Sequence, residues 1–176
     1  MLIWEYPTTD AALIRRNMAG CAVAGCAADA ESFLREDSKG SLVVCASDNA
    51  KPAGAPVVKK LEVLFTGGQH GREGGDWLFH VGLWTPKAFR EEFLAWYKME
   101  HLPILLECPL WDGCRFVEQK VEKGCQFYAM HQMSDKAALD SAERTRSRAT
   151  PWFKRLSANV WFDGAFTRTL CRRLPA

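Results

Sequence analysis

The stretch FLAWYKMEHLPILLECPLWDGCRF (residues 93–116) combines helix-forming residues with an unusual density of aromatic and titratable side chains. We expect a helix over 86–101 that ends or kinks near Pro103, because proline cannot donate to the carbonyl of Met99. His101 then sits in the last turn. Ring side chains recur every four residues and form one stripe along this helix: Phe89, Phe93, Tyr97 and His101.

His101 therefore lies between an aromatic stripe and a helix breaker. A helix C-terminus favours the imidazolium form, whereas burial among aromatic rings disfavours it. Together the two effects predict a pKa near neutrality, which suits a general acid or base. The alternative is a core histidine whose ring bonds to a backbone carbonyl that the proline leaves free.

The pattern from residue 76 onward predicts the order strand, helix, strand, strand, helix, strand. The expected spans are 77–84, 86–101, 114–121, 125–133, 134–147 and 161–170, with a further Thr-Pro helix start at 150. Thr85 and Ser134 are the expected N-caps of the two helices. This order is the α+β, ferredoxin-like split βαβ arrangement, an antiparallel sheet with helices on one face. The sheet face without helices must be buried by another element, commonly a second copy of the domain. Two such sheets that face each other form a barrel.

The sequence before residue 76 is less regular. We divide the chain into 1–66, a Gly-rich loop over 67–75, and 76–176. The first part contains strand, helix and strand in order, so it is either a degenerate first ferredoxin-like repeat or an appendage. Its residues 20–37 allow either a short strand followed by a helix from about Asp29, or one poor helix. VVKKLEVLF (57–65) alternates as a single strand.

Composition limits the function. The 176 residues are 48% hydrophobic and 25% charged with a net charge of +2, which predicts a folded domain and argues against a nucleic-acid partner. No secretory signal or run of about 20 apolar residues is visible, so we expect a cytoplasmic protein without a membrane span. Seven cysteines without CxxC spacing predict reduced, buried thiols. ERTRSRATPWFKR (143–155), with five cations, predicts a solvated helix face.

The segment 93–116 resembles the signature of the EthD-like group in the dimeric α+β barrel superfamily. The matching residues are Trp96, Tyr97, Glu100, His101, Pro103, Pro109 and Trp111. TPWFKR (150–155) also resembles a segment that recurs in the group, and the similarity covers about 76–172. Lys98 and Leu110 depart from the pattern, standing where an acid and a glycine are usual.

The resemblance implies a homodimer with a cavity and a small enzyme without a cofactor. The superfamily includes cyclases, isomerases, dehydratases and decarboxylases that act on aromatic or polyketide-like compounds, together with heme binders and quinol oxygenases. We therefore expect lyase- or isomerase-type acid–base chemistry on a hydrophobic small molecule. The alternatives are a binding or accessory protein with the same cavity, and an interaction module whose cavity is filled by its own side chains.

The candidate catalytic residues are His101, Tyr97 and His80. The expected substrate-binding residues are Trp84, Trp96, Phe93, Trp111, Arg115, His131 and Tyr128. If both sheet faces turn to the cavity, the three histidines converge with Tyr97, Trp84 and Arg115. We expect no metal, because no histidine pair has the local spacing of a metal motif. Heme is the alternative cofactor, with His101 or His131 as axial ligand.

Overall fold

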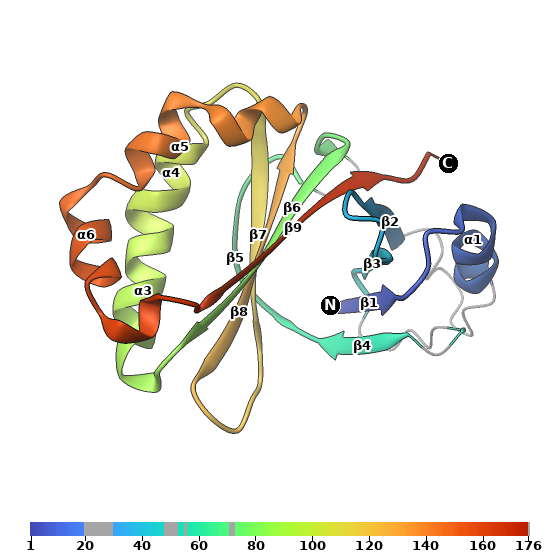
Figure 1. The fold of residues 1–176 in the computed structure, drawn as a ribbon, viewed down its shortest axis with the longest axis horizontal. Helices are drawn as coiled ribbons and strands as arrows, with labels where there is room; N and C mark the ends of the chain where they lie inside the picture. Colours follow the sequence, from blue (N-terminus) through green and yellow to red (C-terminus); the bar gives the residue numbers. More distant parts are fainter. Residues whose placement is uncertain (20–29, 48–52, 55, 71–72, 176) are drawn as a thin grey trace. The chain divides into compact units, whose positions relative to one another are not determined.

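The computed structural model describes residues 1–19, 30–47, 53–54, 56–70 and 73–175 (Figure 1). The chain forms two compact units. Unit 1 comprises Met1–Glu62 and Thr169–Ala176, and unit 2 comprises Val63–Arg168. The division into 1–66, 67–75 and 76–176 stays a prediction.

The strands of unit 2 form an antiparallel sheet in the order β9-β6-β8-β7-β5. Their bounds are β5 (Glu62–Gly68), β6 (Trp77–Thr85), β7 (Trp111–Gln119), β8 (Cys125–Met133) and β9 (Phe166–Arg173), which crosses the unit boundary at Thr169. Numbered along the chain from β6, the four strands β9-β6-β8-β7 have the order 4-1-3-2. This order confirms the ferredoxin-like, α+β fold class and its central hairpin.

The helices of unit 2 lie on one side of its sheet (Figure 1). The first connection holds η2 (Lys87–Phe89), α3 (Arg90–Trp96), η3 (Tyr97–His101) and α4 (Leu102–Leu105). The second holds η4 (Lys136–Asp140), α5 (Ala142–Ser147), α6 (Pro151–Ser157) and η5 (Val160–Phe162). Here η3 is a π-helix, and η2, η4 and η5 are 3₁₀ helices.

The register decides which side chains meet these helices. Phe79 of β6 pairs with His131 of β8, which pairs with Cys114 of β7, so the three side chains share one face. That face packs against the helices in an aromatic core of fully buried residues, among them Phe93, Phe116, Phe127 and Leu156.

The helix does not stop at Pro103, so that alternative is wrong, and the kink stays a prediction. The chain stays helical to Leu105, because the turn before the proline is a π-helix in which Leu102 N–H donates to Tyr97. A wider turn gives the proline ring room beside the preceding turn without breaking the helix. His101 is therefore in mid-helix and has no C-terminal charge near it.

The expected caps are partly wrong. Thr85 is the last residue of β6, and the chain enters the helix through a 3₁₀ turn capped by Pro86 without a side-chain bond. Asp135, rather than Ser134, caps the second helical region, and Ser141 restarts it as α5. Thr150 caps α6 with proline in the first turn, as its sequence predicts.

Unit 1 has its own antiparallel strands in the order β4-β1-β3-β2-β9. Its elements are β1 (Leu2–Tyr6), α1 (Ala11–Ala19), β2 (Ala30–Arg35), β3 (Ser41–Cys45) and β4 (Val57–Lys60). Leu2, Trp4, Tyr6, Ile14 and Val43 are buried in its core.

Two expectations for unit 1 are corrected. A helix from about Asp29 is wrong over Ala30–Arg35, because this segment pairs with β3 on one side and β9 on the other, and that pairing overrides its local helix propensity. The proposed strand over 20–24 lies outside the described residues. The single strand expected over 57–65 is divided at buried Leu61 into β4 and β5.

The repeat interpretation of the N-terminal part stays a prediction. The order β4-β1-β3-β2 is also 4-1-3-2, which supports it. The pairing of two sheets into a barrel and the homodimer stay predictions as well. The five described cysteines are free and buried, namely Cys45, Cys108, Cys114, Cys125 and Cys171. No helix among the described residues is long and apolar enough to cross a membrane.

Candidate functional site

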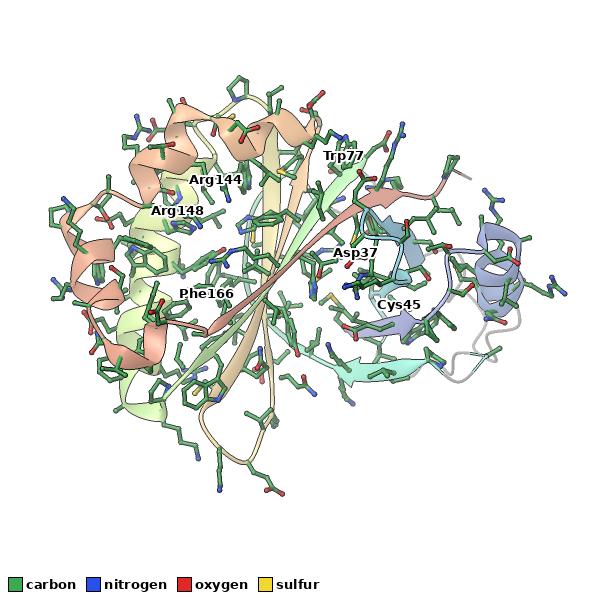
Figure 2. The ribbon with its side chains drawn as sticks, viewed as in Figure 1. Asp37, Cys45, Trp77, Arg144, Arg148 and Phe166 are labelled. Carbon is green, nitrogen blue, oxygen red and sulfur yellow. The ribbon has the colours of Figure 1, made fainter. Side chains whose placement is uncertain are left out.

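A pocket lies between the helices and the sheet of unit 2, with about 550 Å³ of space between its atoms, part of it open to solvent. Aromatic rings, two histidines and three arginines border it. The lining residues used below are Phe79, Trp96, Tyr97, His101, Trp111, His131, Arg144, Arg148, Phe153, Phe162, Phe166 and Arg168. Figure 2 labels Arg144 in α5, Arg148 directly after it, and Phe166 at the start of β9.

Five of the predicted site residues meet in this pocket: His101, Tyr97, Trp96, Trp111 and His131. Phe93 lies behind the wall, fully buried, with its ring 5.5 Å from Trp96 and 6.1 Å from Tyr97. It is a core residue that supports the pocket without lining it.

The predicted convergence of all three histidines is wrong. His80 pairs with Met130, and Gly82 pairs with Tyr128, so these side chains alternate onto the face opposite His131. His80 stacks on Tyr128 there, with ring centroids 5.2 Å apart. Trp84 and Arg115 lie on this same face by register. The roles predicted for these four residues stay predictions, but they are outside the pocket of His101.

A buried hydrogen-bond chain joins three of the lining residues. Trp111 Nε1 donates to His131 Nδ1 at 3.0 Å, and His131 Nε2 lies 2.6 Å from the Tyr97 hydroxyl. All three side chains are at most 3% exposed. Strands β7 and β8 and helix η3 each contribute one member, so the fold itself aligns the chain.

The tautomer of His131 follows from its partners. An indole N–H is a donor only, so Nδ1 of His131 accepts and carries no proton. The neutral ring then has its proton on Nε2, which donates to the oxygen of Tyr97. Among the described residues His131 is the hydrogen-bond partner of that hydroxyl. The Tyr97 proton is therefore available to an acceptor in the pocket.

Burial keeps this chain neutral. It raises the pKa of Tyr97 well above its usual value. It lowers the pKa of His131 well below its usual value, and nearby His101 and Arg144 add to that effect. At neutral pH the pocket thus presents an O–H donor rather than a phenolate.

His101 is also neutral. Its ring lies 4.5 Å from Trp96 and 4.9 Å from Tyr97, measured between centroids. Burial lowers its pKa to about 3, while a main-chain hydrogen bond with Ser147 acts in the opposite direction and Arg148 and Arg144 lower it further. The predicted pKa near neutrality is wrong, because the helix continues past His101 and burial has no charge to offset it.

The three arginines were missed by the sequence reasoning. Arg144 and Arg148 belong to the cationic segment that predicted a solvated helix face, and Arg168 lies in the last strand. Their four-residue spacing places Arg144 and Arg148 on one side of a helix, which is the signal that was present. Only the packing of α5 over the sheet shows that this side meets the pocket.

The histidines were also candidates for metal or heme. Among the described residues no three His, Cys, Asp or Glu side chains are placed to hold a metal ion. Both ring nitrogens of His131 are used within the chain, so it does not fit an axial position. The heme alternative therefore rests on His101 alone.

No family model matches the sequence, and no curated protein matches it. Several solved structures share its fold. An uncharacterized ferredoxin-fold protein from Listeria monocytogenes 4b F2365, related to antibiotic biosynthesis monooxygenases, has a TM-score of 0.66 at 14% identity, over 99% of this chain and 95% of that one.

Two further structures carry functional descriptions. LmHde, a heme-degrading enzyme from Listeria monocytogenes, has a TM-score of 0.62 at 15% identity, covering 98% of this chain and 99% of that one. An anthrone oxidase-like protein has a TM-score of 0.62 at 13% identity, covering 99% and 90%. At these identities the likeness establishes the ferredoxin-like fold. Membership of the EthD-like group stays a prediction.

Proposed function

We propose that the pocket is the active site of a cofactor-independent enzyme that removes a proton next to a carbonyl group of an aromatic compound. The Tyr97 hydroxyl donates a hydrogen bond to that carbonyl oxygen, and His101 receives the proton. Lyase-, cyclase- or isomerase-type reactions all begin with this step. The alternative is a binding protein that uses the same cavity without turnover.

The observation that carries the proposal is the chain from Trp111 through His131 to Tyr97. In this chain the buried Tyr97 hydroxyl accepts a hydrogen bond from His131, so its own proton is available to donate to a ligand. A donor fixed in this way stabilises negative charge on an oxygen without reorganising during the reaction. Aromatic walls at the same place suit an aromatic substrate.

The positive charges of Arg144 and Arg148 affect when His101 can accept a proton. Burial disfavours an imidazolium at His101, and the positive charges of Arg148 and Arg144 lower the pKa of this ring further. When the substrate becomes an enolate, its negative charge attracts both cations and the new imidazolium. Proton transfer is thus favoured only when the substrate takes up the negative charge in the same step.

Anthrone is a suitable probe, because its methylene carbon is conjugated with its carbonyl group through the rings, so that loss of a methylene proton places negative charge on the carbonyl oxygen as in an enolate. One fold neighbour is also described as anthrone oxidase-like. We would incubate the purified protein with anthrone in D₂O without oxygen and follow deuterium incorporation at the methylene carbon by NMR. We expect faster exchange than in buffer, a loss of roughly 10²-fold or more in His101→Ala, and a smaller loss in Tyr97→Phe.

Trp84→Phe is the matched control, since Trp84 lies on the opposite sheet face. Exchange at the buffer rate in the wild-type protein would refute the proposal. Tight anthrone binding without exchange would favour the binding protein. A repeat in air, with oxygen uptake recorded, decides whether the carbanion goes on to react with oxygen.

A further inference from the structure

We propose that the pocket selects aromatic compounds that carry an oxyanion, a carboxylate or a phosphate, which Arg144, Arg148 and Arg168 hold at one end while the aromatic rings hold the body. This inference names the substrate class of the same pocket, and it rests on the proposed function only for the ligand's location. Its test measures binding alone.

Ion pairing separates these arginines from three others in unit 2. Arg90, Arg146 and Arg155 each form an ion pair, with Glu118, Glu107 and Glu92 respectively. Among the described residues no carboxylate lies within ion-pair distance of the three pocket arginines. In this respect the three pocket arginines differ from Arg90, Arg146 and Arg155.

The three cations also repel one another. Arg148 lowers the pKa of Arg144 and that of Arg168, after the larger effect of burial on each. Gathering like charges around one cavity is unfavourable unless an anion occupies it. A bound oxyanion offsets this repulsion and supplies a negatively charged partner for the guanidinium groups.

Two of the three side chains, those of Arg144 and Arg168, are held against the wall by contacts within the chain. The Arg144 guanidinium lies over the ring of Phe79 at 5.9 Å and donates to the main-chain oxygen of Leu139. The Arg168 guanidinium lies over the ring of Phe166 at 5.0 Å. Both contacts fix a planar fork, the geometry that recognises carboxylate and phosphate through two parallel hydrogen bonds.

The aromatic part of the pocket lies beside these cations. Phe153 and Phe162 form one wall, with centroids 5.6 Å apart, and Phe162 lies 4.7 Å from Phe166. Trp96 lies 5.8 Å from Phe153 and continues the wall to His101. A ligand with one charged edge and a flat apolar body matches this division.

The test is calorimetric titration with three compounds that share one ring system: 1-naphthoate, 1-naphthyl phosphate and the neutral 1-naphthamide. We expect at least one anion to bind roughly tenfold or more tightly than the amide at low salt. Arg148→Gln and Arg168→Gln should each weaken that anion roughly 5- to 20-fold and change the amide less than about twofold. The affinities of 1-naphthoate and 1-naphthyl phosphate show whether the pocket prefers a carboxylate or a phosphate.

Arg146→Gln is the matched control, because Arg146 lies in the same helix and pairs with Glu107 outside the pocket. The inference is overturned if both anions bind no better than the amide, if none of the compounds binds, or if Arg146→Gln weakens the anion as much as Arg148→Gln. Charge selectivity that survives in His101→Ala, without anthrone exchange in the wild type, would refute the proposed function and leave this inference standing.

Discussion

The two units share a strand order but differ in what connects their strands. The strands β1 to β4 of unit 1 are arranged 4-1-3-2, and so are the strands β6 to β9 of unit 2 when they are numbered from β6. The first connections are alike in length, residues 7–29 in unit 1 and 86–110 in unit 2. The second connections are not: residues 46–56 in unit 1 and 134–165 in unit 2.

The longer second connection of unit 2 explains why the pocket lies in that unit. Arg144, Arg148, Phe153 and Phe162 all come from the long second connection of unit 2, and they form the wall that faces the sheet. The 11 residues of 46–56 are too few to supply two comparable helices. A ferredoxin-like sheet with one helical connection has a core, but a ligand site of this kind needs the second connection as well.

The largest expected effect concerns the aromatic core behind the pocket. Phe93 is fully buried and its ring lies 5.9 Å from that of Phe127, so Phe93→Ala should lower the free energy of unfolding by about 3–5 kcal/mol. Urea denaturation measures this loss. Trp4→Ala, at a fully buried position of unit 1, should cost a similar amount.

Phe93→Leu separates packing from ligand contact. Because Phe93 does not line the pocket, this variant should lose less than about 1.5 kcal/mol and bind the favoured naphthyl anion within about twofold of wild type. A tenfold loss of affinity with stability retained would return Phe93 to the binding site.

Acid should weaken unit 2, since His101 and His131, whose pKa values burial lowers, both lie in it. An unfolded histidine binds its proton near pH 6.5, whereas folded His101 does so only near pH 3. The unfolded chain therefore holds more protons between these values. Stability is full above about pH 6.5 and is lost as the pH falls towards 3.

Between pH 7 and pH 5 we expect a loss of about 2 kcal/mol from His101. His131, whose pKa is also lowered, adds a loss in the same direction. Urea denaturation at both pH values should show that His101→Gln reduces this dependence by about 2 kcal/mol. His70→Gln controls for the loss of a histidine outside the pocket. An unchanged dependence in His101→Gln would contradict the lowered pKa.

The smallest expected losses of stability come from removing one helix cap in each unit. Asp10 accepts from Ala12 N at 2.9 Å and Leu13 N at 3.1 Å, so Asp10→Ala should cost about 1 kcal/mol. Thr150 accepts from Phe153 N and also donates to Glu100 at 2.6 Å, joining α6 to the π-helix. Thr150→Ala should therefore cost more, about 1.5–2 kcal/mol, whereas Thr150→Ser keeps both bonds.

Thermal unfolding of the three variants ranks these costs. Equal losses for Asp10→Ala and Thr150→Ala would mean that the Glu100 bond adds nothing to stability.

The sequence predicted those elements whose signal is local. The expected strands over 77–84, 114–121 and 125–133 correspond to β6, β7 and β8. The Thr-Pro pair marked the start of α6. Ala30–Arg35 failed because its strand form depends on neighbours distant in sequence. Such pairing cannot be seen in a single segment.

The residues of the pocket also fall into those that a local sequence pattern predicts and those that it does not. The stripe of Phe93, Tyr97 and His101 is local, and the structure places their rings in contact along one helix. Whether His80 or His131 faces that stripe depends on the register of β6 against β8, which is non-local. The arginines were hidden because a cationic helix face looks the same in sequence whether it meets solvent or a pocket.

The π-helix over Tyr97–His101 suggests how such a site can be gained or lost in evolution. A π turn is an α-helix with one extra residue, so a single inserted codon is enough to create it. The wider turn absorbs the extra residue, so the helix after it keeps its orientation towards the sheet, and the residues within the turn change the side that they face. A gene of this fold can therefore exchange the residue facing its pocket in one event, without altering any residue of the sheet.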